Sequence, residues 1–283
     1  MSLVYDRKTQ KISEEPQYGG GSLNFLYKNA IGRLMLRFFV GHLFSNINAA
    51  LNKTKRSQQK IAPFIEKYHI DASVYNLDDF DSFASFFTRQ NLSLKPVLAK
   101  NIFISPAQAK LSVYKITKGQ TITIKNSQYS IEDLIGEKSV DNYRGGNCFV
   151  YRLAMDDYHR YCYVDNGEII RQKHIKGKLH TVSSISSDYK IFAQNDRICN
   201  FMHTDNFGDI IQVEVGAILV GRIRNHDNTV FKKGSEKGYF ELGGSTIVII
   251  TKNNIQIDED ILQNSSRGIE TKINYGERVG KKC

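Results

Sequence analysis

The stretch FKKGSEKGYFELGGSTIVII, residues 231–250, contains the most informative pattern in the chain. Its last part, residues 247–250, is a continuous apolar run of the kind that forms a strand buried on both faces. Glycine permits the backbone conformations of tight turns, and four glycines interrupt the part before this run. Read by itself, Gly243-Gly244-Ser245-Thr246 is a turn that leads into a buried strand. The stretch therefore predicts a buried strand that begins at about Thr246.

Further strands are expected on both sides of this stretch. Short β-branched runs broken by Gly, Asn and Asp recur from Pro96 to the C-terminus, as is typical of strands in a compact, mostly antiparallel sheet. The expected strands are 102–104, 111–116, 121–125, 148–154, 160–164, 191–192, 198–203, 210–215, 217–223 and 246–251. Residues 96–283 are therefore predicted to form a β-rich catalytic domain.

The N-terminal part has a helical pattern. Residues 1–21 show no periodicity and are expected to be a flexible lead. From Ser22 to about Asn52 apolar residues recur at steps of three to five, which predicts an amphipathic helix or helix pair. Residues 60–68 and 81–90 are expected to form two more helices. Phe83, Phe86 and Phe87 of the second one, with Phe80 just before it, lie along one side. Residues 22–95 are thus a helical region suited to membrane contact, and the fold class is α+β.

Composition and charge restrict the class of protein. The 283 residues are 41% hydrophobic and 24% charged, which is typical of a folded chain. The net charge is +10, and residues 1–60 hold ten Lys or Arg against three acids, a surplus of +7. A polyanionic partner is therefore expected. An anionic membrane surface fits, whereas nucleic acid is disfavoured because neither an RNP-type aromatic motif nor a helix-turn-helix pattern is present.

Cysteine spacing and hydropathy exclude further classes. The four cysteines have no C-x-x-C spacing, so we expect no metal site and no disulfide framework. The N-terminus lacks the apolar region of a secretory signal. The longest apolar stretch, residues 34–44, is well below the roughly 20 residues of a membrane-spanning helix. We therefore expect a chain in a reducing cytosol, without a spanning segment.

The residues upstream of Ser245 extend the motif. Gly234, Glu236, Gly238 and Phe240 precede it, and the whole pattern resembles the signature of phosphatidylserine decarboxylases, K-G-x-E-x-G-x-F followed by a Gly-Ser-Thr cleavage site, in its Gly-Gly-Ser-Thr form. The resemblance covers residues 75–280. Other segments that match in the same order are Phe80 to Arg89, Ser105-Pro106-Ala107, Arg152 to Tyr161, Asn195-Asp196-Arg197 and Val215 to Gly221.

This resemblance implies a zymogen that processes itself. In the family the serine hydroxyl attacks the preceding carbonyl, here that of Gly244, and the chain divides at that bond. Ser245 then becomes an N-terminal pyruvoyl group, which is the implied cofactor, and the implied chains are 1–244 and 245–283. Through a Schiff base with this group, phosphatidylserine loses CO2 and becomes phosphatidylethanolamine. The implied activity is that of a carboxy-lyase.

Three further residues are candidates for the catalytic site. His159 is the candidate base that removes the proton from Ser245. A lone histidine is more often structural, but Asp157 would project on the same side of a strand and could orient the imidazole. Gln108 stands where many family members have the Asp of an Asp-His-Ser arrangement, and Cys162 where many have a second histidine. Because an amide cannot stabilise an imidazolium as a carboxylate does, Gln108 favours slow or blocked maturation. The alternative is that Asp157 replaces the missing carboxylate, and self-cleavage needs only one turnover, so a large loss of rate need not abolish it.

The resemblance and the charge also predict partners. We expect a peripheral enzyme at the cytoplasmic face of the cell membrane, with phosphatidylserine as its lipid partner and a second copy as a homodimer partner. The apolar pattern around residues 23–44, interspersed with Lys28, Arg33 and Arg37, suits a membrane interface. It equally suits a helix that covers the protein's own core or a dimer partner. The alternative function is a catalytically silent phosphatidylserine-binding relative, which the presence of Gln108 suggests.

Overall fold

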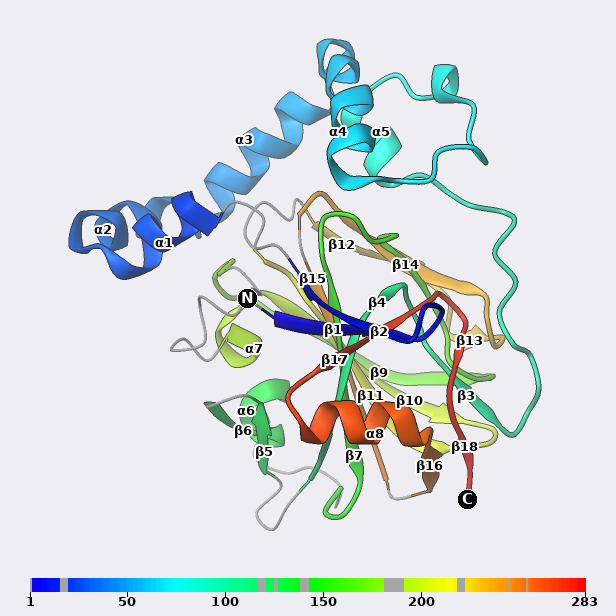
Figure 1. The fold of residues 1–283 in the computed structure, drawn as a ribbon. Helices are drawn as coiled ribbons and strands as arrows, with labels where there is room; N and C mark the ends of the chain where they lie inside the picture. Colours follow the sequence, from blue (N-terminus) through cyan, green and yellow to red (C-terminus); the bar gives the residue numbers. More distant parts are fainter. Residues whose placement is uncertain are drawn as a thin grey trace.

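The structure is a computed structural model that describes residues 2–15, 20–116, 121–124, 127–137, 143–180, 191–217, 222–243, 245–252 and 254–283. Helices dominate the first third of the chain and strands dominate the rest (Figure 1). The α+β class predicted from the sequence is confirmed.

The helices are α1 (Gly20–Lys28), α2 (Ala30–Phe39), α3 (His42–Asn52), α4 (Ile61–Tyr68), α5 (Phe83–Phe87), α6 (Ile131–Ile135), α7 (Ile191–Gln194) and α8 (Glu259–Ser266), with 3-10 turns at Lys55–Lys60 and Leu77–Asp79. The strands are β1 (Ser2–Asp6), β2 (Lys11–Glu15), β3 (Ile102–Ile104), β4 (Ala109–Lys115), β5 (Thr121–Ile124), β6 (Ser127–Ser130), β7 (Asn147–Leu153), β8 (Arg160–Cys162), β9 (Gly167–Ile175), β10 (Arg197–Thr204), β11 (Gly208–Val215), β12 (Arg222–Asn225), β13 (Val230–Phe231), β14 (Glu236–Glu241), β15 (Ser245–Thr251), β16 (Ile255–Ile257), β17 (Glu270–Ile273) and β18 (Arg278–Lys282).

A ten-stranded sheet forms the centre of the body, in the order β13-β9-β10-β11-β15-β7-β4-β17-β1-β2. Neighbouring strands are antiparallel except β1 and β17, which run parallel. β15 lies between β11 and β7, and all of its residues are buried. The apolar run 247–250 explains this position, because a strand covered on both faces needs apolar side chains on both.

Two connections between strands meet at the start of β15. In the large sheet, Leu153 at the end of β7 lies opposite Ser245. In a separate sheet, β12-β14-β8, Arg160 lies opposite Tyr239, and the Phe240 amide donates a 3.0 Å hydrogen bond to the His159 carbonyl. The β7–β8 connection (154–159) and the described part of the β14–β15 connection (242–243) therefore run side by side between the same two sheets.

An aromatic cluster from α4 and α5 packs against the β14–β15 connection. α5 begins with a capping box in which Ser82 and Ser85 satisfy each other's backbone amides. The buried members of the cluster are Ile61, Phe64, Phe83, Phe86, Phe87 and Leu242. The helix predicted at 81–90 is present as the shorter Phe83–Phe87. Its phenylalanines hold Leu242, three residues before Ser245, in the interior.

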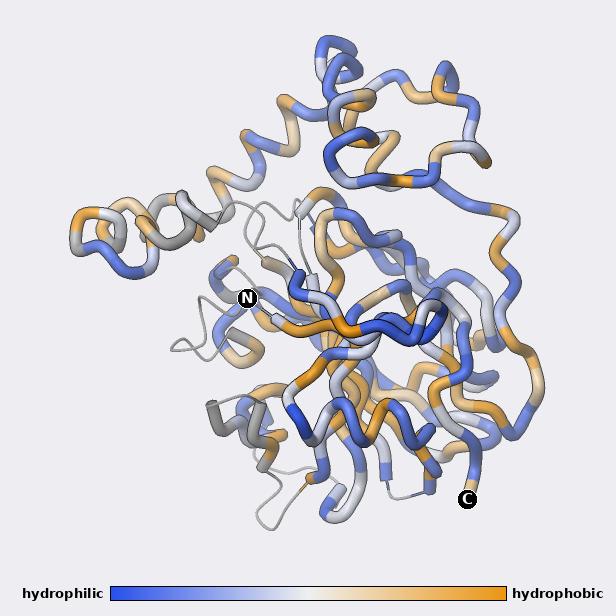
Figure 2. The backbone as a smooth tube through the Cα atoms, in the orientation of Figure 1, coloured by the Kyte–Doolittle hydropathy of each residue, from blue (hydrophilic) through white to orange (hydrophobic). Residues whose placement is uncertain are grey.

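Helices α1 to α3 form an arm that extends away from the sheets (Figure 1). Apolar residues recur along the arm between polar ones, as Figure 2 shows. Several of these apolar side chains are exposed, namely Phe25, Ile31, Leu34, Met35, Leu43, Ile47 and Leu51. Among the described residues, no helix has both the length and the hydropathy needed to span a bilayer.

Several expectations for local structure are wrong. Residues 2–15, expected as a flexible lead, form the hairpin β1–β2. β2 is mostly polar and exposed, so its sequence has no apolar alternation that would indicate a strand. Residues 191–192 belong to the helix α7 and not to a strand. The helix pair at 22–52 is three helices, with breaks at Asn29 and near Gly41. β9 was not predicted, since its exposed polar residues mask the pattern. Residues 218–221 of the strand predicted at 217–223 lie outside the described residues.

Candidate functional site

Ser245 occupies an unusual environment for a hydroxyl group. It is the first residue of β15 and has no exposed surface. Its Oγ has no hydrogen-bond partner among the described residues. Burial of a hydroxyl without a partner costs about 1–3 kcal/mol, and among the described residues β15 has three such groups, on Ser245, Thr246 and Thr251. Gly244, the other half of the predicted cleavage site, lies outside the described residues.

The backbone just before the cleavage site is strained. Leu242 has a φ of 38° and Gly243 a φ of 102°, both in the left-handed region. Leucine seldom adopts this conformation, and its presence here means that the surrounding packing imposes it. The aromatic cluster of α4 and α5 supplies that packing, because Leu242 is one of its buried members. Tertiary contacts therefore hold the conformation of the backbone at Leu242, just before the predicted cleavage site.

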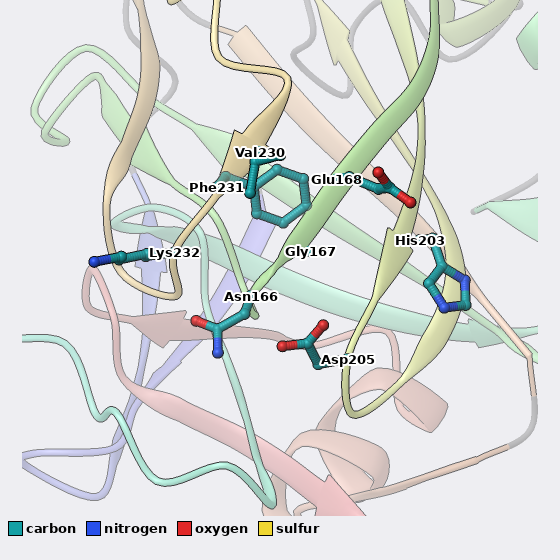
Figure 3. Close-up of a pocket in the computed structure, with 8 residues that line it drawn as sticks. All are labelled: Asn166, Gly167, Glu168, His203, Asp205, Val230, Phe231 and Lys232. Atoms are coloured by element: carbon teal, nitrogen blue, oxygen red, sulfur yellow. The ribbon is translucent and has the colours of Figure 1, made fainter.

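Two cavities differ in their relation to this connection. The larger, about 450 Å³, is lined by residues of β9, β10 and β13 (Figure 3). His203 there lies opposite Asp209, and the adjacent Ile210 lies opposite Thr251, so this cavity is at the end of β15 far from Ser245. A second cavity, about 360 Å³, lies between α3, α5 and β14, with Lys53, Glu241 and Leu242 in its wall. The smaller cavity therefore lies beside Leu242, three residues before Ser245.

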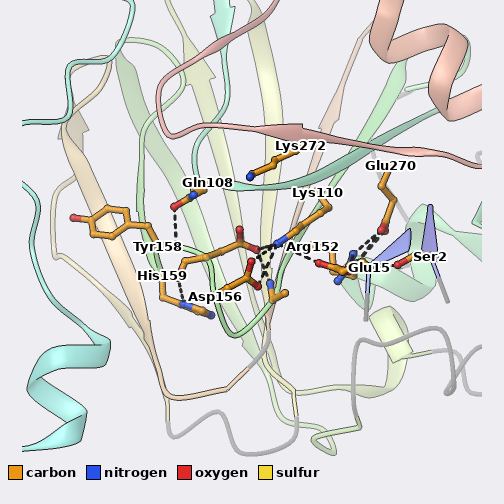
Figure 4. Close-up of polar contacts among 12 residues, drawn as sticks. Ser2, Glu15, Gln108, Lys110, Arg152, Asp156, Tyr158, His159, Glu270 and Lys272 are labelled. Atoms are coloured by element: carbon orange, nitrogen blue, oxygen red, sulfur yellow. Dashed lines mark hydrogen bonds and ion pairs between the residues drawn. The ribbon is translucent and has the colours of Figure 1, made fainter. Parts of the chain in front are cut away.

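His159 is a buried, neutral imidazole with a defined tautomer. Its Nδ1 lies 2.9 Å from the Asp157 carbonyl (Figure 4). A carbonyl only accepts, so Nδ1 carries the hydrogen and the lone pair resides on Nε2. Burial lowers the pKa of His159 to about 3, against the opposing effects of the Asp157 carbonyl and the Gly243 backbone. Nε2 has no hydrogen-bond partner among the described residues, so it is available to accept a proton.

The neighbours of His159 place it at the cleavage segment. The Gly243 backbone is close enough to favour its protonated form, and the Phe87 ring lies 4.4 Å from its ring, centroid to centroid. Gly243 is two residues before Ser245, and Phe87 belongs to the cluster that holds Leu242. Two predicted site residues, His159 and Ser245, thus come from connections that the topology brings together.

Asp157 does not orient His159 in the expected way. Residues 154–157 form a turn and not a strand, and it is the Asp157 carbonyl that contacts the imidazole. The carboxylate points elsewhere, accepting 2.7 Å hydrogen bonds from Lys110 Nζ and from the Ala154 amide. Burial raises the pKa of Asp157 to about 6 in spite of the opposing charge of Lys110. Asp157 therefore acts on His159 through its backbone.

Gln108 also differs from the expected arrangement. Its Oε1 accepts a 3.0 Å hydrogen bond from the Tyr158 amide, one residue before His159 (Figure 4). No hydrogen bond joins Gln108 to the imidazole among the described residues. The tautomer of His159 is therefore set by the Asp157 carbonyl, and the residue at position 108 supports the backbone of the same turn.

A buried ion network behind this turn was not predicted. Lys110 and Arg152 stand among apolar residues in mostly buried strands, and a buried cation requires partners of opposite charge. This pattern was the available signal in the sequence. The carboxylates that surround the two cations are Glu15, Asp156, Asp157 and Glu270.

Comparison with known proteins identifies relatives along the whole chain. A family model described as phosphatidylserine decarboxylase matches residues 83–281. The chain is 47% identical to "Phosphatidylserine decarboxylase proenzyme 2" of Clostridium acetobutylicum, over 98% of both chains. It is 37% identical to "Phosphatidylserine decarboxylase proenzyme" of Clostridium botulinum (strain Alaska E43), over 100% of this chain and 99% of the relative. It is also 37% identical to "Phosphatidylserine decarboxylase proenzyme" of Fusobacterium nucleatum, over 97% of this chain and 96% of the relative. The resemblance stated from the sequence is confirmed.

Proposed function

The chain belongs to the phosphatidylserine decarboxylase family, and from this membership we propose that it is a proenzyme that cleaves itself between Gly244 and Ser245 and then converts phosphatidylserine to phosphatidylethanolamine and CO2. The observation that carries the proposal is the buried Ser245 Oγ, which lacks a partner among the described residues and follows a strained connection beside a neutral imidazole. The family name denotes carboxy-lyases.

Cleavage would begin as an exchange of an amide for an ester. Ser245 Oγ attacks the Gly244 carbonyl carbon, the Gly244–Ser245 C–N bond breaks, and the Ser245 nitrogen becomes a free amine. His159 Nε2 takes the hydroxyl proton and can return it to that nitrogen. The left-handed conformation of Leu242 would favour the reaction, because strain in the precursor that is released in the transition state lowers the barrier.

The ester would then divide the chain. Loss of the Ser245 Cα proton and breakage of its Cβ–O bond release residues 1–244 with a terminal carboxylate and leave dehydroalanine at position 245. Its imine tautomer takes up water and loses ammonia, which leaves a pyruvoyl group on residues 245–283. A pyruvoyl ketone supplies an electron sink for the loss of CO2 from an amino acid headgroup. The unpartnered Ser245 side chain fits this use, since no described contact would be broken when its hydroxyl is consumed.

The test of the proposal is the intact mass of the purified protein. In proportion to chain length, we expect chains of about 28 kDa and about 4.5 kDa in place of 32.3 kDa. The small chain should be lighter, by the mass of one ammonia, than residues 245–283 with a serine N-terminus. Release of CO2 from phosphatidylserine vesicles tests the second half. A single 32.3 kDa chain after prolonged incubation would contradict the proposal.

The alternative function, a catalytically silent lipid-binding relative, depends on whether Gln108 blocks maturation. Because the Asp157 carbonyl sets the His159 tautomer, we infer that an amide at position 108 does not block maturation. We expect Gln108→Asp to change the rate of self-cleavage by about threefold or less, since either side chain can accept from the Tyr158 amide. The rate is measured by denaturing electrophoresis after pulse-labelled cell-free translation. A large acceleration by Gln108→Asp would instead support a processing-impaired chain.

The arm of α1 to α3 suits the lipid substrate. Its exposed apolar side chains include Ile31 and Leu34, each 68% exposed. Lys28 at the end of α1, and Lys53 and Arg56 just after α3, are exposed as well. An apolar face with basic residues beside it binds anionic membrane surfaces. We therefore propose peripheral binding at the cytoplasmic face of the membrane, which places the 360 Å³ cavity between α3 and β14 near the lipid headgroups. The homodimer expected from the sequence stays a prediction, for which light scattering is the measurement.

The arm can be tested by two substitutions. We expect Ile31→Asp and Leu34→Asp each to weaken binding to phosphatidylserine-containing vesicles by about tenfold, because each removes an apolar side chain from the lipid and adds a negative charge. Leu92→Asp is the matched control, since Leu92 is 85% exposed but lies outside the arm. Vesicle sedimentation measures binding. Equal losses for all three variants would point to general effects of charge.

A further inference from the structure

Three cations lie in a row on neighbouring strands of the large sheet. The last cation of the row is opposite Thr246, the residue after Ser245. Arg152 on β7 is opposite Thr246, Lys110 on β4 is opposite Arg152, and Lys272 on β17 is opposite Lys110. Residues directly opposite each other in antiparallel strands share one face, and like charges in such positions repel. Lys272 is more exposed and pairs with Asp6 at 3.3 Å. Lys110 and Arg152 are largely buried, so their repulsion must be offset inside the protein.

Glu15 is the carboxylate placed between these two buried cations. One of its oxygens lies 2.5 Å from Arg152 Nη2 and the other 3.3 Å from Lys110 Nζ (Figure 4). Among the described residues it alone contacts both. Glu270 pairs with Arg152 only, and Asp156 and Asp157 pair with Lys110 only. Without Glu15, adjacent cations would face each other with no shared counter-ion.

The network continues from Lys110 to the turn that orients His159. Lys110 Nζ donates to the Asp157 carboxylate at 2.7 Å, and the same carboxylate accepts from the Ala154 amide. These contacts close the turn at 154–157. The Asp157 carbonyl at the end of that turn accepts the hydrogen of His159 Nδ1. A displacement of Lys110 therefore acts directly on the residue that fixes the imidazole.

The hairpin that carries Glu15 is anchored at its other end. The Arg7 guanidinium forms ion pairs with three carboxylates near the C-terminus and also donates to the Arg278 carbonyl. The partners are Asp258 at 3.0 Å, Asp260 at 2.7 Å and Glu277 at 2.9 Å. Together with the parallel pairing of β1 and β17, these contacts fix the position of β2, and therefore the position of Glu15 at its end.

We propose that Glu15, delivered by the N-terminal hairpin, is a positioning residue for self-cleavage, because it neutralises Arg152 and Lys110 together and thereby holds the turn that orients His159. This role rests on the proposed function and assigns residues 2–15 to the maturation machinery. The N-terminal hairpin is then required for a reaction that occurs more than two hundred residues later in the chain.

The experiment compares Glu15→Gln with Glu14→Gln. Glu14 is the preceding residue and is exposed, so its substitution makes the same charge change on the same strand outside the network. We expect Glu15→Gln to slow self-cleavage by roughly tenfold to a hundredfold, as misplacement of a catalytic group does, and Glu14→Gln to leave the rate unchanged. Pulse-labelled cell-free translation followed by electrophoresis gives the rates.

A second readout does not depend on cleavage. In the Ser245→Ala precursor with ¹⁵N-labelled histidine, the imidazole nitrogen shifts report which nitrogen of His159 carries hydrogen, and loss of a signal in His159→Gln assigns it. We expect the Nδ1-H signature with Glu14→Gln and a mixed signature with Glu15→Gln. If the parent chain never cleaves, the proposed function fails, while the imidazole shifts still test the role of Glu15.

Two results would overturn the role of Glu15. One is a parental cleavage rate and imidazole signature in Glu15→Gln, and the other is an equal effect of Glu14→Gln. If Glu15→Gln does not fold, Glu15→Asp takes its place, because it keeps the charge and shortens the reach. An intermediate rate with an altered imidazole signature supports the role in that case, and parental values contradict it.

Discussion

Ser245→Ala is expected to leave the chain whole. The substitution removes the only atom that can convert the Gly244–Ser245 amide to an ester, so neither cleavage nor a pyruvoyl group can follow, and decarboxylation should be lost entirely. We expect the variant to keep its fold, because Ser245 Oγ is buried without a hydrogen-bond partner among the described residues. Its removal should leave the free energy of unfolding unchanged or raise it by about 1 kcal/mol.

The same strand supplies a control for Ser245→Ala. Thr251 lies at the other end of β15, is fully buried, and its Oγ1 likewise has no hydrogen-bond partner among the described residues. Thr251→Val removes that hydroxyl with little change in volume, and we expect this variant to cleave at the parental rate. Intact mass and thermal unfolding are measured for both variants. Cleavage in Ser245→Ala, or none in Thr251→Val, would assign the reaction to another group.

His159→Gln is expected to have the second largest effect. An amide of similar size keeps the packing against Phe87 and can donate to the Asp157 carbonyl, but it cannot take a proton from Ser245. General bases contribute about 10²- to 10⁴-fold to a rate, so we expect self-cleavage to slow by that factor. Some cleavage should remain after long incubation, because each molecule needs a single turnover.

An exposed histidine is the control for this change. His174 lies on β9, which does not pair with β15, and its side chain is 50% exposed. Its Nε2 atom lies 3.1 Å from an Asp196 carboxylate oxygen. We expect His174→Gln to cleave at the parental rate in the same pulse-labelled assay. A parental rate for His159→Gln would show that a different group, or water, removes the proton from Ser245.

The residues of the site could be predicted from the sequence better than the contacts between them. The motif at 234–246 led to Ser245 and to the buried strand after it because both depend on local sequence. The Asp-Tyr-His-Arg segment led to His159. The contact that fixes the imidazole comes from the Asp157 carbonyl, and residue type does not reveal which backbone atoms face a side chain. The expected role of the Asp157 carboxylate and the expected place of Gln108 beside the imidazole therefore differ from what the structure has.

Long-range pairing explains the other differences. The hairpin at 2–15 is stable because β1 pairs with β17 and Arg7 meets three carboxylates more than two hundred residues away, and such partners leave no local pattern. The strand predicted at 191–192 is a helix because two apolar residues cannot distinguish the two states. The antiparallel sheet and the aromatic helix were predictable since each repeats a simple period.

The central position of β15 determines what the product of self-cleavage must be. Strands of residues 1–244 flank β15 on both sides, and two more strands of the C-terminal segment pair with β4 and β3. After cleavage the 39-residue piece cannot depart without dismantling the middle of the sheet. The two polypeptides would remain interlocked for the lifetime of the enzyme, and separately synthesised halves should fail to assemble. Each molecule would therefore form its pyruvoyl group once, within the folded protein, and could not exchange the 39-residue chain that carries it for another.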